Sequence, residues 1–288
     1  MEGFLYQLFA GLAMGGIYAC MGLALVIIYQ ATHVVNFAQG EMAMLSTYLA
    51  WTLLGTGMPY WVAMILTLLA SFAVGALVEL LVIRRIPKES PLAVVIAMVG
   101  LLVIINSMVG WVFTYDTKDF HTPFSGKSPV PMLSSHEFGA LLVTLVVMGL
   151  VFLFFRFTRI GLGMRAAAAN PVSAKLVGIS VGGMLSLGWG LAASVGAVAG
   201  VMTAPFVYLD PNMMMSIIIY AFAGALLGGI TNPWGAVIGG FMVGIFENLV
   251  GAYVVGSELK LSVALALIVA IVTMKPEGLF GRRVVHRV

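Results

Sequence analysis

Long apolar blocks follow one another along this sequence and constrain its fold more than any other feature. They lie at about 4–29, 41–55, 60–83, 91–114, 138–156, 182–207, 213–230, 235–255 and 260–274. A helix needs about 20 apolar residues to cross the hydrocarbon core of a bilayer, and only helices or closed barrels pair every backbone polar group there. Charged residues make up only 9% of the chain, too few to cover a water-soluble domain. The sequence therefore predicts an all-α, polytopic transmembrane helix bundle, formed as a single domain over residues 1–288.

The number of membrane segments is less tightly bounded than the fold class. The block at 41–55 is too short to cross a bilayer comfortably, and a polar turn precedes it. We therefore expect about eight to ten membrane segments, including one element that can be broken or re-entrant. No Lys or Arg occurs before Arg84, so the positive region of a signal peptide is missing, and we expect the first block to be a retained span.

Positive charge gathers in three segments between or after the apolar blocks. The loop at 84–88, the central stretch at 156–175 and the tail at 275–287 hold most of the Lys and Arg residues. Threading the blocks as spans puts these three segments on one side, and the excess of positive charge marks that side as cytoplasmic. The C-terminus is therefore predicted to be cytoplasmic. The net charge of +3 is small and divided among separate loops, which argues against a nucleic-acid partner.

The central stretch at 157–183 combines this positive charge with helix signals. Residues 164–169 are good helix formers, whereas Asn170 favours a helix cap and Pro171 fits a first helical turn. A second short helix is expected at about 172–177, ending at a glycine. From these residues alone, the stretch is either a helix lying on the membrane surface or a docking element for a soluble partner.

Polar residues within or beside the apolar blocks are candidates for lining or gating a path across the membrane, because charge inside a bilayer normally faces a cavity or a partner. These candidates are Asn36, Gln39, Glu41, Asn106 and Glu247. Other roles stay open for them. Asn36 and Glu41 could have no other role than to cap a helix that starts at Met42. Asn106 and Asn248 could form hydrogen bonds that hold neighbouring helices together.

Glycines at four-residue spacing predict close packing between helices, since small residues let helix backbones approach each other in lipid. The pairs are Gly11/Gly15, Gly196/Gly200, Gly224/Gly228, Gly235/Gly239 and Gly240/Gly244. The Gly- and Pro-rich segment at 228–236 predicts a tight chain reversal. Glu79 lies about one helical turn from Arg84 and could simply pair with it.

Recognisable catalytic and nucleotide-binding motifs do not accompany these residues. The sequence has no GxxxxGK[ST] loop, no HExxH and no cluster of Cys and His, and its one cysteine, Cys20, provides neither a disulfide nor a metal site. We therefore expect no enzyme activity, no metal and no other cofactor in this chain. The energy for moving a solute would come from an ion gradient or from a second protein.

Several short motifs, taken in order, make the chain resemble the permease subunits of branched-chain amino acid ABC importers, of the LivH-like type. They are VNFAQGE at 35–41, GLGMRA at 161–166, NP at 170–171, AKLVGI at 174–179, LGGI at 227–230, GA at 235–236, GG at 239–240 and MKPEGLFG at 274–281. The resemblance covers nearly the whole chain. It implies a subunit of a bacterial inner membrane that forms the translocation path for amino acids, above all branched-chain ones.

The resemblance also implies partners and a coupling segment. The partners are a second permease subunit (LivM-like, or another copy of this chain), two cytoplasmic ATPase subunits that bind the ATP, and a periplasmic substrate-binding protein. Residues 157–183 would be the cytoplasmic coupling segment that contacts the ATPase. The matching positions are Gly161, Gly163, Met164, Arg165, Ala166, Asn170, Pro171 and Gly178.

One departure and several alternatives accompany this resemblance. Many relatives carry histidine where this chain has Gln39, which keeps hydrogen bonding but removes a titratable group. Related permeases serve urea, short amides or aromatic acids, so these substrates stay open. A gradient-driven secondary transporter that uses Glu247 and Glu41 is the competing class.

Overall fold

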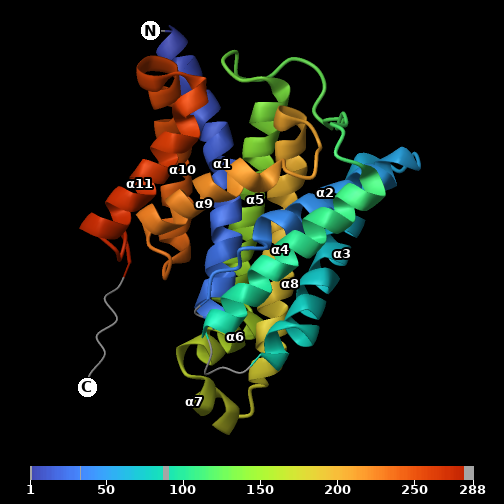
Figure 1. The fold of residues 1–288 in the computed structure, drawn as a ribbon, viewed down its shortest axis with the longest axis vertical. Coiled ribbons are helices and arrows are strands. Elements are labelled where there is room, and N and C mark those ends of the chain that lie inside the picture. The colour runs from blue at the N-terminus through green and yellow to red at the C-terminus, as the bar shows by residue number, and fades with distance from the viewer. Residues whose placement is uncertain (1, 33, 87–90, 282–288) are drawn as a thin grey trace. The chain divides into compact units, whose positions relative to one another are not determined.

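The structure, a computed structural model, describes residues 2–32, 34–86 and 91–281. Pro87 and Lys88 of the first basic loop and Arg282, Arg283 and Arg287 of the basic tail lie outside the described residues. Within the described part, regular structure is helical apart from an isolated bridge between Lys118 and Leu209. Each predicted apolar block contains a helix, which confirms the all-α fold class (Figure 1).

Six helices in the described part of the chain are long and apolar enough to cross a membrane. They are centred on α1 (Glu2–Thr32), α3 (Tyr60–Leu81), α4 (Pro91–Phe113), α5 (Ser135–Phe157), α8 (Val181–Val207) and α10 (Pro233–Val250). Shorter apolar helices are α2 (Gln39–Gly55), α9 (Met214–Gly228) and α11 (Lys260–Met274). The remaining elements are α6 (Arg159–Ala169), α7 (Pro171–Leu176), η1 (Ile83–Arg85), η2 (Gly251–Val255) and η3 (Ser257–Leu259). The chain is a multi-pass membrane protein.

The helices group into two compact units. Unit 1 takes the described residues of 1–26, 124–144 and 216–288, and unit 2 those of 27–123 and 145–215. Helices α1, α5 and α9 therefore contribute to both units.

Unit 1 is built on glycine-lined crossings of α10 with α1 and α9. A Cβ atom on Gly244 or Gly240 would collide with the backbone of Gly15 or Ala19 on α1, and a Cβ atom on Gly224 would lie 2.7 Å from the Cα of Gly240. The predicted glycine pairs of these three helices are confirmed as sites of close backbone approach. Because the contacts are between backbones, no side-chain movement can make room for a larger residue.

The C-terminal segment at 275–281 folds back on the α9–α10 turn of unit 1. The backbone N–H groups of Leu279 and Phe280 donate to the carbonyl oxygens of Leu227 (2.7 Å) and Gly228 (3.1 Å) at the end of α9. Asn232 caps α10 by accepting from the N–H of Trp234 and donates its amide to the Phe280 carbonyl oxygen at 3.1 Å. The predicted reversal at 228–236 is confirmed.

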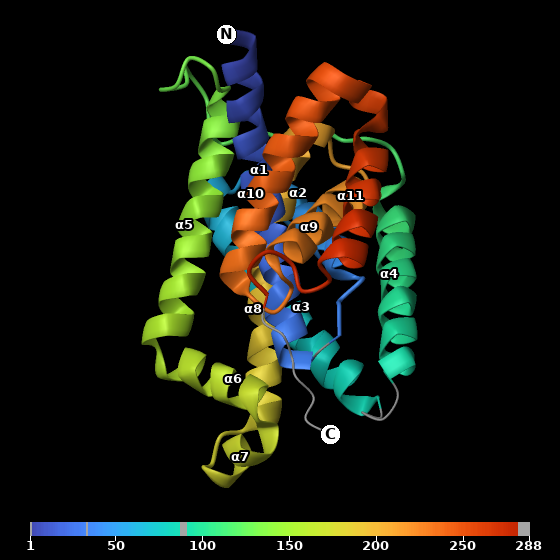
Figure 2. The same ribbon diagram turned by 90° about the vertical axis from the view of Figure 1, so that its left-hand side faces the viewer.

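Unit 2 is organised around α8, which packs against α2 and α3. Trp189 of α8 is fully buried, and the backbone of α3 approaches it at Gly75. Gly196 and Gly200 of α8 face Gln39 and Thr47 of α2, so the predicted pair on α8 is also a close packing site. Figure 2 shows α6 running from the end of α5 to the side of α8, with α7 beyond it.

Candidate functional site

The helix α6 extends further than its sequence signal. It begins at Arg159, because the Thr158 side-chain oxygen accepts a hydrogen bond from the N–H of Gly161 at 2.9 Å and caps the first turn. Gly161 then lies against the backbone of Phe154 and Phe155, where a Cβ atom would not fit. The helical run predicted at 164–169 is confirmed and is the second half of this helix.

Asn170 turns the chain from α6 into α7. Its Oδ1 accepts from the N–H groups of Val172 (3.1 Å) and Ser173 (3.0 Å), and Pro171 occupies the first helical position. Gly178 follows α7 with a φ of +84°, a backbone conformation that glycine adopts without strain. The prediction of two short helices joined by an Asn-Pro corner is confirmed, with α7 starting one residue early because Pro171 begins it.

Replacing Asn170 with alanine should destabilise α7, because the N–H groups of Val172 and Ser173 would lose their acceptor. A lost cap costs about 1 kcal/mol, so amide hydrogen exchange in α7 should accelerate by about fivefold. Asn170→Asp keeps an acceptor at the same place and is the matched control. Equal exchange rates in the two variants would contradict the capping role.

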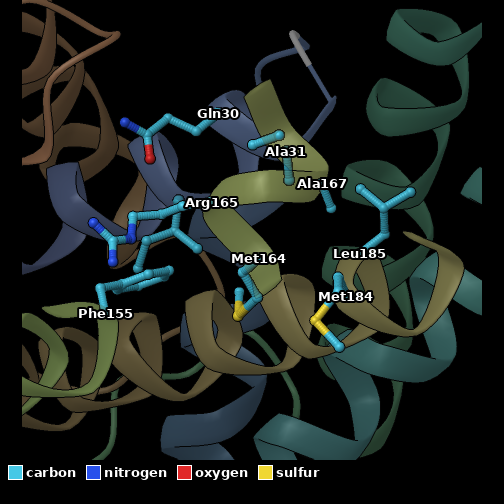
Figure 3. A pocket seen from close by; sticks show the side chains of 10 residues that line it. Gln30, Ala31, Phe155, Met164, Arg165, Ala167, Met184 and Leu185 are labelled. Atoms are coloured by element: carbon cyan, nitrogen blue, oxygen red, sulfur yellow. The ribbon is translucent and has the colours of Figure 1, made fainter. Parts of the chain in front are cut away.

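The two short helices are held against α8 by a small apolar cluster of Ala167, Ala174 and Val181, one residue from each helix. Beside it, a mostly apolar cleft lies among α6, α8 and the ends of α1 and α5 (Figure 3). Met164 and Met184 line it, and Arg165 lies next to Phe155 at its margin. The contacts carried by α6 and α7 therefore lead directly into α8.

α7 and the residue that follows it carry large apolar side chains that the described part of the chain leaves exposed. Val172, Leu176 and Val177 are all exposed, Leu176 at 83% of its surface. Val172 and Leu176 are four residues apart and share one side of the helix. We call these three residues the α7 face. Exposed apolar residues on a short helix at the end of a membrane bundle are typical of a binding surface.

The polar turn before α2 is tied to α8. Asn36 accepts from the N–H of Ala38 at 3.0 Å and donates to Gln39 at 3.0 Å, and Gln39 donates its amide to the Ala192 carbonyl oxygen at 3.0 Å. The helix begins at Gln39 without a side-chain cap, so the alternative in which Asn36 and Glu41 only cap a helix from Met42 is wrong. Asn36 and Gln39 are buried and fix the turn.

Glu41 and Asn106 meet in unit 2. The Nδ2 of Asn106 lies 3.3 Å from Glu41 Oε2, 2.9 Å from the Pro211 carbonyl oxygen and 3.3 Å from Asn212 Oδ1. Tyr115 donates its hydroxyl to Asn106 Oδ1 at 3.3 Å. Asn106 therefore forms hydrogen bonds between α2, α4 and the segment before α9, which was the alternative left open for it, and its role in a path stays a prediction.

Glu79 pairs with Arg84, as its spacing indicated. Arg84 donates to both carboxylate oxygens, at 3.1 and 2.7 Å, and to the Gly182 carbonyl oxygen at 2.6 Å. Ser186 of α8 donates to Glu79 as well, a partner that spacing along the chain could not reveal. This group joins α3 to the start of α8.

Glu247 belongs to a cluster within unit 1. The Tyr18 hydroxyl donates to it at 2.8 Å, and the Lys260 ammonium lies 3.4 Å from its other oxygen. Lys260 begins α11, so this ion pair joins α11 to α10. Asn248 donates to Gln7 at 2.7 Å, which confirms its predicted role as glue between helices.

The described residues form neither a metal site nor a corner that exposes a nucleophile. No group of three or more His, Cys, Asp and Glu among them could hold a metal ion. Residues 178–182 read GISVG and match the GxSxG spacing, but they connect α7 to α8 without a preceding strand. They therefore do not form the strand–turn–helix corner that exposes a nucleophilic serine.

A family model that matches nearly the full chain identifies the family. Residues 7–272 match the model of the family described as branched-chain amino acid transport system, permease component. The chain belongs to this family. The resemblance drawn from the ordered motifs is thus confirmed, and the chain is a permease component of a transport system.

Curated relatives cover the permease almost from end to end. It is 29% identical over 306 residues to the high-affinity branched-chain amino acid transport system permease protein LivH of Salmonella typhimurium, covering 99% of this chain and 98% of that protein. It is 28% identical over 304 residues to BraD of Pseudomonas aeruginosa, with the same coverage. A probable LivH of Methanocaldococcus jannaschii is 30% identical over 280 residues, covering 91% and 87%. No solved structure matches the permease.

Proposed function

We propose that this permease is the membrane subunit of an ATP-driven importer and moves branched-chain amino acids into the cytoplasm. The observation that carries the proposal is the full-length similarity to LivH and BraD, which are named as branched-chain amino acid permeases. The same names favour this substrate class over urea, short amides and aromatic acids. They also favour an importer with separate components over a gradient-driven transporter.

In this proposal the segment from α6 to α7 couples the permease to a partner ATPase, which binds and hydrolyses the ATP. The exposed α7 face supports it, because Val172, Leu176 and Val177 need an apolar groove to cover them. The excess of basic residues at 156–175 supports a cytoplasmic position for the segment. Gly161, Gly163, Met164, Arg165, Ala166 and Gly178 shape α6 and the end of α7 rather than the face itself.

The remaining partners follow from the importer class. They are a second permease subunit, which is LivM-like or a second copy of this chain, two ATPase subunits and a periplasmic substrate-binding protein. The permease lies in the bacterial inner membrane with its C-terminus in the cytoplasm, as the distribution of Lys and Arg indicates.

Motion of the ATPase reaches the membrane helices through contacts in unit 2. A shift of α7 acts on α8 through Ala174 and Val181, which pack together. The start of α8 is bound to α3 through the Arg84 contacts with Glu79 and Gly182. α8 also carries the Ala192 carbonyl that holds Gln39. A push on α7 is thereby transmitted to α3 and to the turn before α2.

The decisive experiment is reconstitution in proteoliposomes with and without the ATPase subunits. Radiolabelled L-leucine should enter only when the permease, the ATPase, external binding protein and ATP are all present. A Walker-lysine variant of the ATPase is the matched control and should abolish uptake. Uptake driven by an ion gradient with the permease alone would contradict the proposal.

A further inference from the structure

Glu41 differs from two other carboxylates of this permease in the charge beside it. Glu79 has the guanidinium of Arg84 beside it, and Glu247 has the ammonium of Lys260. Glu41 is only 8% exposed, and its one side-chain partner among the described residues is the neutral amide of Asn106 at 3.3 Å. A buried carboxylate is strongly disfavoured unless a cation or several donors compensate for the water it has lost. The described part of the chain does not supply that cation.

Lys118, in the loop after α4, does not neutralise the charge of Glu41. Lys118 pairs through its backbone with Leu209, just before the segment that contacts Asn106. Its ammonium lies over the ring of Trp51, 5.6 Å from the ring centre, and forms no ion pair with Glu41. The position of Glu41 in the first turn of α2 adds the favourable end of the helix dipole, which stabilises a negative charge there.

Hydrogen-bond acceptors outnumber donors around Asn106. Its amide nitrogen has only two hydrogens but faces acceptor oxygens from Glu41, Pro211 and Asn212. At least one of these oxygens is therefore without a hydrogen from Asn106 at any moment. A group with three N–H donors and a positive charge would satisfy the oxygens and neutralise the carboxylate together, and a primary ammonium has both properties.

The acceptors can be reached from outside unit 2. Glu41 and the backbone of Pro211 are buried, whereas Asn106 is half-buried, Asn212 is exposed and Tyr115 is 56% exposed. The group thus runs from an exposed rim to a buried carboxylate. Tyr115 holds the oxygen of Asn106, so the amide nitrogen stays turned toward the acceptors.

We propose that Glu41, the Pro211 carbonyl oxygen and the Asn212 side-chain oxygen bind the ammonium group of the transported amino acid. Asn106 occupies these acceptors when no substrate is bound, and the substrate ammonium takes its place. The identity of the ligand as an amino acid rests on the proposed function. The position of the site follows from where the oxygens of Glu41, Pro211 and Asn212 lie around Asn106.

The test uses the complete importer in proteoliposomes with the Glu41→Gln variant. Glutamine keeps the shape and an acceptor for Asn106 but removes the negative charge, so assembly with the ATPase should be unchanged. Uptake of L-leucine should fall by about tenfold or more, as expected for one lost charge-assisted hydrogen bond. Glu258→Gln, at an exposed carboxylate of η3, is the matched control and should leave uptake unchanged.

A binding measurement separates ammonium recognition from a structural role of Glu41. Saturation-transfer NMR on the assembled importer compares L-leucine with 4-methylpentanoate, which has the same skeleton without the ammonium. The wild-type complex should prefer leucine, and Glu41→Gln should lose that preference while its thermal unfolding midpoint stays unchanged.

Three outcomes would overturn the site: equal binding of the two ligands by the wild type, an unchanged preference in Glu41→Gln, or displacement of leucine by sodium ions alone. Normal leucine uptake by Glu41→Gln would also overturn it while leaving the proposed function intact. Absence of uptake by the wild-type importer would instead count against the proposed function.

Discussion

Gly244→Leu should prevent unit 1 from reaching its native packing. A Cβ atom at this position would collide with the backbone of Gly15 on α1. Two helix backbones in contact cannot yield as a flexible side chain would, so we expect a loss of more than about 3 kcal/mol. The measurement is the fraction of expressed protein that elutes as a single species after detergent extraction, together with its thermal unfolding midpoint.

Gly149→Leu is the matched control for this substitution. Gly149 is also a helical glycine, but no heavy atom lies within 4 Å of the place where its Cβ would stand. The same side chain should therefore be tolerated there. Similar elution and unfolding midpoints for the two variants would show that α1 and α10 do not cross at Gly244.

Leu176→Asp should separate the permease from the proposed ATPase partner while leaving the permease folded. Leu176 is 83% exposed in this chain, so a carboxylate there costs the isolated permease little. In the proposed complex the same position is covered by an apolar groove, where an unpaired charge is strongly unfavourable. We expect ATPase affinity to fall at least about 30-fold, the size of a central interface contact, and leucine uptake to fall with it.

Co-purification of the ATPase with tagged permease, followed by titration, measures this effect. Leu176→Met keeps the apolar surface and should retain both affinity and uptake. If Leu176→Asp binds the ATPase as tightly as the wild type does, the α7 face is not the contact. If uptake is lost while ATPase binding is unchanged, the α7 face acts in a transport step that follows docking of the ATPase.

The two short helices α6 and α7 could be predicted from sequence because their signals are local. Asn170 and Pro171 define the corner through their own side chains and ring, within three residues of the groups they affect. The start of α6 was missed only because the cap at Thr158 lies before a run of weaker helix formers. Helix boundaries that are set by residues adjacent in the sequence can be predicted without knowledge of the tertiary contacts.

The partners of the buried polar groups could not be predicted in the same way. Glu247 was a candidate for the path, but its pairing with Lys260 depends on how α10 and α11 pack. Glu79 showed its local partner Arg84 in the sequence, whereas Ser186 lies more than a hundred residues away along the chain. The meeting of Glu41 with Asn106 and Pro211 is equally non-local. Sequence reasoning pointed to polar residues within the apolar blocks and left their partners in the fold open.

The contact between the C-terminal segment and α9 also has a consequence for biogenesis. The carbonyl groups of Leu227 and Gly228 at the end of α9 receive their hydrogen bonds from Leu279 and Phe280. During synthesis, α9 and α10 are both translated before those two residues. The turn between the two helices is therefore completed only after the segment that follows α11 has been made.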